Sequence, residues 1–175
     1  MEQLVVTNRM RAIRVEKVTL NIGAGKDQVV LQKGERLIEQ LTGRKPVKTR
    51  TQKRIPGWSL RPGLPIGLKL TLRGKAAEEL LPRLLSAKSG RLQESNIDEA
   101  GNVSFGIPEY IDIEGAKYDP EIGIIGLQVC VTLARPGYRL KYRRLRRTKP
   151  GEAHRITKEE AKAFMNERFN VKFEE

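Results

Sequence analysis

The chain has 175 residues, of which 34 are Lys or Arg and 21 are Asp or Glu, so its formal net charge at pH 7 is +13. That charge argues against an ordinary soluble enzyme. The length predicts one folded domain, which should bury about 70% of the surface that the unfolded chain exposes. One cysteine allows no internal disulfide, and one cysteine with one histidine is too few for a metal cluster, so we expect neither a metal nor a cofactor.

The first predicted element is a strand over residues 13–22, where apolar and polar residues alternate with one slip near Lys17. A turn at residues 23–25 follows. An apolar stripe then predicts an amphipathic helix over residues 27–41, and Gly43 lies just beyond its last turn.

Two more strands are expected at residues 46–51 and 66–73, with a loop rich in proline and glycine between them. In the second strand leucine alternates with Lys69, Thr71 and Arg73, so its polar face is basic and is predicted to face a ligand. Residues 75–87 predict a second helix, which Pro82 should kink or restart.

Strands at residues 102–108 and 124–133 complete the predicted sheet, and in the latter we expect Cys130 to be a small buried thiol. Thr157 and Glu160 form a capping box that opens a short final helix. The order of elements predicts an α+β fold with two layers, in which helices pack on one face of an antiparallel sheet. We place one α+β domain at residues 1–134 and a basic C-terminal extension, ending in a short helix, at residues 135–175.

The basic residues are concentrated in two tracts. Residues 44–75 hold ten bases and no acid, residues 135–149 hold eight bases and no acid, and residues 76–134 hold ten acids against four bases. Such polarity favours a polyanion, and arginine favours phosphate, so nucleic acid is the expected partner. A solvated face and an acidic membrane surface are the alternatives. Proline and glycine break the first tract, which excludes the amphipathic helix that membrane binding needs.

The turn Gly23-Ala24-Gly25-Lys26 lies between a strand and a helix, where a phosphate loop would lie, but it lacks the spacing of a nucleotide P-loop. Two interpretations of this segment remain: a tight turn that only connects the strand to the helix, or a group of backbone N–H donors that binds a nucleic-acid phosphate. No catalytic group of residues is evident, because the single His154 falls in an exposed, charged tail.

The loop over residues 53–61 holds the only tryptophan, Trp58, between Lys53, Arg54 and Arg61. Aromatic and aliphatic tips between cations suit stacking on a nucleotide with phosphates alongside. The alternative is that Trp58 folds back into the core.

Six segments in order resemble a known family: residues 18–25, 42–50, 65–74, 101–107, 118–122 and 135–138. Together they are similar to the fifth protein of the large ribosomal subunit, which binds 5S rRNA, over residues 10–165. The basic tail after Arg135-Pro136-Gly137-Tyr138 resembles the archaeal and eukaryotic branch, since the bacterial branch lacks that extension.

The resemblance implies an antiparallel sheet with helices on one side, no enzymatic activity and a cytoplasmic, ribosomal location. It implies that rRNA is bound by the exposed sheet face and the adjoining loops: Asn21, Gly23, Gly25, Arg44, Lys45, Lys48, Thr49, Arg50, Lys69, Thr71 and Arg73. Arg44 replaces the family's usual glutamine, so a phosphate contact there would replace a hydrogen bond to a base or sugar. In the tail, the expected rRNA contacts are Arg139, Lys141, Arg143, Arg144, Arg146, Arg147 and Lys149.

The resemblance also implies other partners. The loop formed by Lys53, Arg54, Ile55, Pro56, Gly57, Trp58, Ser59, Leu60 and Arg61 would reach the elbow of a P-site tRNA. A small-subunit protein would meet another edge at an intersubunit bridge, which we place at the acidic residues 96–121. Large-subunit rRNA and a second 5S-binding ribosomal protein would join the assembly in the central protuberance. A free-standing RNA chaperone or translational regulator, and a nucleotide enzyme acting at the Gly23 turn, are the competing hypotheses.

Overall fold

The computed structural model describes residues 8–174 and holds a five-stranded antiparallel sheet in the order β2-β3-β1-β6-β5. The strands are β1 (Arg14–Gly23), β2 (Val47–Arg50), β3 (Pro65–Leu72), β5 (Val103–Ile107) and β6 (Leu127–Ala134). The helices are α1 (Gln28–Thr42), α2 (Lys75–Ser86) and α3 (Lys158–Phe169). The α+β class and the antiparallel sheet predicted from the sequence are confirmed.

Helix α1 has both of its expected ends. The Asp27 carboxylate accepts a hydrogen bond from the backbone N–H of Val29 at 2.8 Å, and Gly43 ends the helix in the left-handed conformation with φ of 66°. Gly34 lets the helix approach β3 closely, since a Cβ there would stand 3.0 Å from Leu68 Cδ1.

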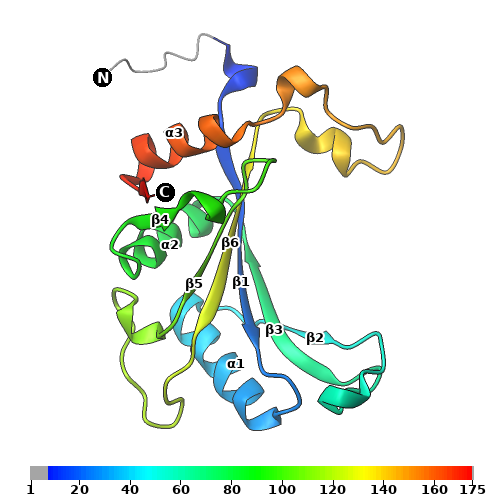
Figure 1. Cartoon of the computed structure of the whole chain (residues 1–175), viewed down its shortest axis with the longest axis vertical. Helices are drawn as coiled ribbons and strands as arrows, with labels where there is room; N and C mark the ends of the chain where they lie inside the picture. Colours follow the sequence, from blue (N-terminus) through cyan, green and yellow to red (C-terminus); the bar gives the residue numbers. More distant parts are fainter. Residues whose placement is uncertain (1–7, 175) are drawn as a thin grey trace.

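Helices α1 and α2 cover one face of the sheet (Figure 1). Their apolar stripes pack on the inward side chains of the central strands, such as Val18, Leu20 and Val131, which are fully buried. No helix within residues 8–174 packs on the opposite face, which is left to solvent. This open face positions the candidate site.

Local details differ from the prediction. β6 begins at Leu127 rather than Ile124, because residues 119–126 form a turn and irregular chain that lead into it. Helix α2 runs through Pro82 as one element, so Pro82 does not start a new helix, and a kink there stays a prediction. β4 (Arg91–Gln93) and β7 (Lys172–Glu174) were not predicted; they are three-residue strands that pair in parallel and are too short to show a periodicity.

The C-terminal extension is docked on the sheet domain by a buried arginine. Arg135 donates hydrogen bonds to the carbonyls of Arg11, His154 and Arg155 and to the Glu160 carboxylate. Helix α3 buries Ala161 and Met165 in the same core as the sheet. The predicted capping box of Thr157 and Glu160 is confirmed.

His154, expected in an exposed tail, is instead half-buried, with Nε2 2.9 Å from the Pro136 carbonyl oxygen. Among residues 8–174, no helix has both the length and the apolar character required to cross a membrane.

Candidate nucleic-acid interface

The centre of the open face combines uncharged polar side chains with the charge of Lys69. Strand alternation directs Thr19 and Asn21 of β1 away from the helices, and in the antiparallel register Thr19 lies opposite Thr71 of β3 while Asn21 lies opposite Lys69. Side chains directly opposite on antiparallel strands lie about 5 Å apart at Cβ. The sheet therefore gathers Asn21, Lys69 and Thr71, three predicted site residues, into one patch.

The other half of the open face was missed by the sequence analysis. Gln128 lies opposite Asn21, and the Asn21 side-chain amide donates to Gln128 Oε1 at 2.8 Å. Cys130 lies between Thr19 and Ser104 and is exposed, so the expectation of a buried thiol was wrong. The sequence of β6 did carry a signal for this exposed face. Gln128, Cys130 and Thr132 alternate with buried aliphatic residues, a pattern typical of a strand with one solvent-exposed face.

Strand β2 divides its polar residues between the two faces. Thr49 lies opposite Gly67 on the open face, whereas Lys48 lies opposite the buried Leu68. Lys48 therefore points to the helix side, where its Nζ lies 3.0 Å from a carboxylate oxygen of Glu35 on α1. The structure does not bring Lys48 into the patch formed by Asn21, Lys69 and Thr71.

The remaining predicted bases near the sheet are exposed at its borders. Arg44 and Lys45 follow the end of α1, Arg50 ends β2, and Arg73 follows β3. None of these four residues makes an ion pair within residues 8–174, so their charges are available to a polyanion.

The turn that carries Gly23 and Gly25 is a tight connection between β1 and α1. The backbone N–H groups of Ala24 and Gly25 both donate to the Ile66 carbonyl, and that of Asp27 donates to Ala24. These three N–H groups are therefore not available to a phosphate, which argues against an N–H concavity at this turn. Gly25 itself has φ of 58°, a conformation that glycine adopts without strain.

The first basic arm consists of residues 51–64, between β2 and β3. Hydrogen bonds from the N–H groups of Thr51 and Gly63 close its base, and a bridge between Ile55 and Leu60 shapes its tip. Leu60 is buried, while Trp58 is 70% exposed, so the alternative of Trp58 as a core plug was wrong. The predicted residues 53–61 thus present an aromatic ring on a cationic loop.

The second basic arm consists of residues 139–150 and starts from the buried Tyr138. The hydroxyl of Tyr138 accepts from Ile156 N–H at 3.0 Å and donates to the His154 carbonyl, which fixes the two ends of the arm together. This arm carries all seven predicted tail residues: Arg139, Lys141, Arg143, Arg144, Arg146, Arg147 and Lys149.

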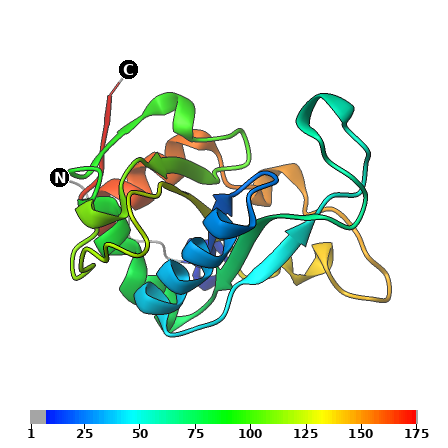
Figure 2. The same cartoon turned by 90° about the horizontal axis from the view of Figure 1, so that it is seen from below.

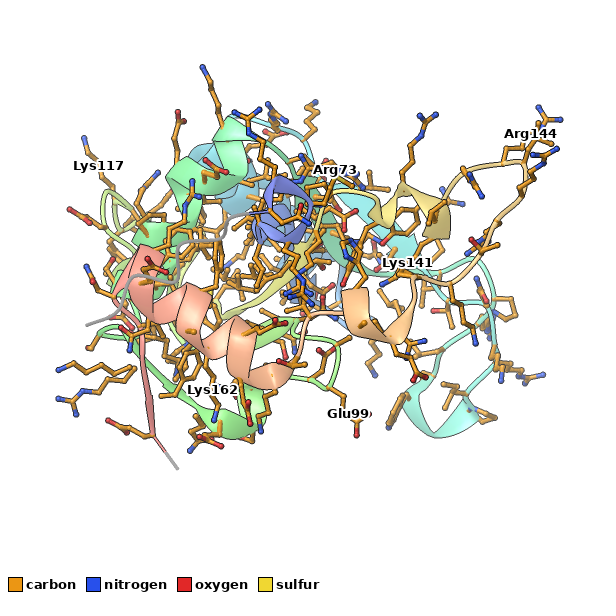
Figure 3. The ribbon with its side chains drawn as sticks, turned by 90° about the horizontal axis from the view of Figure 1, so that it is seen from above. Arg73, Glu99, Lys117, Lys141, Arg144 and Lys162 are labelled. Carbon is orange, nitrogen blue, oxygen red and sulfur yellow. The ribbon has the colours of Figure 1, made fainter. Side chains whose placement is uncertain are left out.

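Both arms project on the side of the sheet opposite α1 and α2 (Figures 1 and 2). The side chains of the second arm reach outward as far as Arg144, whereas Lys141 lies nearer the body of the protein (Figure 3). The arrangement is a polar sheet face, with Lys69 among its uncharged side chains, flanked by two loops without acidic residues. Such a surface can pair hydrogen bonds in its centre with phosphate contacts at its borders.

The acidic residues lie elsewhere and are partly neutralised. Arg36 on α1 pairs with Glu121, and Gln40 donates to Asp119. A hydrogen bond from Lys162 and the nearby charges lower the pKa of Glu94, although desolvation opposes the shift. Within residues 8–174, no three His, Cys, Asp or Glu side chains are placed to hold a metal ion.

Comparison with known proteins gives matches over nearly the whole chain. Residues 8–61 match the family model described as ribosomal protein L5, and residues 65–171 match the model of the C-terminus of the same ribosomal family. The chain is 51% identical over 163 residues to the large ribosomal subunit protein uL5 of Nanoarchaeum equitans, covering 93% of this chain and 96% of the relative. It is 48% identical over 172 residues to that of Sulfurisphaera tokodaii, covering 98% and 97% of the two chains.

Proposed function

The chain belongs to the ribosomal L5 family, and from this membership we propose that it binds 5S rRNA and attaches it to the large subunit in the central protuberance. The family consists of structural ribosomal proteins, so this chain is a non-enzymatic component of the large subunit and acts in the cytoplasm, on the ribosome.

The observation that carries the 5S proposal is the polar face, which includes Lys69, between two basic arms. RNA helices expose 2′-hydroxyl groups and base edges in a wide, shallow minor groove, which a flat surface of short polar side chains can approach. Thr71 and Asn21 supply hydrogen-bond donors and acceptors at the centre of that surface, and Lys69 adds a charge next to Asn21. The arms would then hold the RNA by its phosphates, including segments of large-subunit rRNA.

The first arm is proposed to contact the elbow of a P-site tRNA. Support comes from the Trp58 ring, which is 70% exposed, and from Lys53, Arg54 and Arg61, which are exposed in the same loop. An aromatic ring can stack on an unpaired base while neighbouring cations contact phosphates.

The acidic surface of residues 96–121 is proposed to contact a basic small-subunit protein at the intersubunit bridge. A second ribosomal protein is proposed to bind the same 5S rRNA. The acidic region includes Asp98, Asp112 and Glu114, which have no ion pair within residues 8–174. On a chain of net charge +13, an acidic surface away from the two arms favours a basic protein over RNA.

The deciding experiment measures binding of the purified protein to 5S rRNA, to tRNA and to a random RNA duplex over a range of salt concentrations. The wild type is compared with the double variant Asn21→Ala/Thr71→Ala. The control is Gln32→Ala/Asn166→Ala, which removes two exposed polar groups from α1 and α3. We expect tight binding selective for 5S rRNA, weakened about tenfold or more by the first pair of substitutions and unchanged by the control.

Equal binding to all three RNAs, with the same salt slope and no effect of Asn21→Ala/Thr71→Ala, would contradict the proposal and favour a general RNA chaperone. Co-sedimentation with large subunits in high salt separates the same two cases, because a transient chaperone washes off. For the first arm, fluorescence of the single tryptophan should change when tRNA is added, and an unchanged spectrum would exclude a contact at Trp58.

A further inference from the structure

The second basic arm borders a hollow that is lined by both apolar and cationic side chains. The hollow has a volume of about 610 Å³, is open to solvent and is lined by Gly137, Arg139, Leu140, Arg143, Arg144 and Leu145. Its volume lies within the usual range of small-ligand sites, about 300–1,000 Å³. Two leucines therefore contribute an apolar lining between three guanidinium groups.

The loop around this hollow is held in one shape by its own backbone. The N–H of Thr148 donates to the Leu140 carbonyl at 3.2 Å, and the N–H of Arg143 donates to the Arg139 carbonyl at 2.9 Å. The Arg143 Nε–H donates to the Arg146 carbonyl at 2.7 Å. Arg146 has φ of 49°, a conformation that costs free energy in a residue other than glycine and is maintained by its surroundings.

The arm also exposes more apolar surface than phosphate binding requires. Leu145 is 76% exposed and Tyr142 is 58% exposed, and both sit within the run of arginines. A single exposed leucine needs no explanation, but Leu145 forms part of the lining of the hollow. An apolar side chain beside arginines matches the two parts of a nucleotide, its base and its phosphate.

We propose that this hollow receives the base of a single unpaired nucleotide, so that the second arm recognises a bulge or loop in RNA in addition to phosphate charge. Leu140 and Leu145 would contact the base, and Arg139, Arg143 and Arg144 would stack on it or bind the flanking phosphates. The inference rests on the proposed RNA-binding function and adds a specificity to one part of it.

The test uses two RNA hairpins with identical stems, of which one carries a single bulged 2-aminopurine nucleotide and the other is fully paired. We expect the wild type to bind the bulged hairpin about tenfold more tightly, which is the size of effect that one stacked base gives. The fluorescence of 2-aminopurine should rise on binding, because the base leaves the helical stack.

Leu145→Ala is the informative variant, since its side chain is too exposed to support folding, and Ile124→Ala, 66% exposed in another loop, is the matched control. Leu145→Ala should abolish the preference for the bulge and the fluorescence change, while affinity for the paired hairpin and its salt slope stay as in the wild type. Equal wild-type affinity for both hairpins, or an unchanged preference in Leu145→Ala, would overturn the inference.

Failure of this inference differs from failure of the 5S proposal. If the hollow takes no base, selectivity for 5S rRNA and its dependence on Asn21 and Thr71 persist. If the chain does not select 5S rRNA, that selectivity is absent whatever the hairpins show.

Discussion

The guanidinium of Arg135, only 4% exposed, donates a 2.6 Å hydrogen bond to the carboxylate of Glu160 and thereby ties the end of β6 to the first turn of α3. The same guanidinium satisfies three backbone carbonyls from both ends of the chain. The interaction joins the parts of the fold on either side of the second basic arm, because residues 139–150 lie between Arg135 and Glu160 in the chain.

Arg135→Ala should lower the free energy of unfolding by about 2–4 kcal/mol. The substitution leaves buried carbonyls without a donor and removes the partner of Glu160, and each such loss costs about 1–3 kcal/mol. Urea denaturation measures the change. Arg139→Ala removes the same charge from an exposed position and should shift stability by less than about 0.5 kcal/mol. Equal effects of both variants would contradict the proposed role of Arg135.

Stability should fall in acid partly through Glu160. Desolvation raises the pKa of Glu160, but a backbone hydrogen bond at Thr157 and the hydrogen bond and charge of Arg135 outweigh it, so the pKa is lowered. A carboxyl group with a lowered folded-state pKa stabilises the fold above its unfolded-state pKa, and the stabilisation disappears as the pH falls through the folded-state value. Between about pH 5 and pH 3, wild type should therefore lose more stability than Glu160→Gln. Parallel losses would exclude Glu160 as a contributor.

Gly101→Ala should destabilise the contact between the sheet domain and the extension. Gly101 has φ of 75°, and a methyl group there would stand 2.7 Å from Cγ2 of the buried Ile156. We expect a loss of about 1–3 kcal/mol in thermal or urea unfolding. Gly151→Ala is the control, because Gly151 has φ of −57° and nothing within 4 Å of an added Cβ, and its stability should stay the same or rise slightly.

Cys130 provides a direct probe of the open face. It is the only cysteine and is exposed between Thr19 and Ser104, so a maleimide should label the free protein. If the open face binds 5S rRNA, saturating RNA should slow labelling at least severalfold, whereas a non-binding RNA should not. Cys130→Ser gives the background. Undiminished labelling of a demonstrably RNA-bound protein would place the contact elsewhere on the surface.

The second arm should contribute much of the salt dependence of RNA binding. Deleting residues 139–149 removes seven bases and should weaken the affinity for RNA. The slope of log K against log salt concentration should also become less steep, by about 0.9 for each duplex phosphate that the protein no longer neutralises. Arg144→Gln/Arg147→Gln/Lys149→Gln tests the same effect with the loop intact. Lys33→Gln/Lys117→Gln/Lys172→Gln removes equal charge away from the arms and should leave the slope nearly unchanged. An unchanged slope in the deletion would refute this role for the arm.

The sequence by itself determined the principal helices and strands, the two acid-free tracts and the family. Hydrophobic periodicity specifies α1 and β3 because helices and strands repeat side-chain direction over a few residues. Caps such as Gly43 and the Thr157 box are equally local. The basic tracts are properties of the chain, whereas the structure decided between the two alternatives for Trp58, whose side chain is exposed.

Only the tertiary structure decided which face each residue occupies and which distant partners it meets. Alternation in β6 carried a signal that Cys130 shares a polar face with Gln128 and Thr132, but in the four-residue strand β2 it does not say which face the helices cover, so it could not pair Lys48 with Glu35. The N–H groups of the Gly23 turn are taken up by Ile66, more than 40 residues away along the chain. From the sequence, Arg135 counted as one more base of the tail. In the structure it is buried and connects the end of β6 to α3 through hydrogen bonds to three carbonyls and to Glu160. A buried charge is stable only where the folded chain supplies such partners.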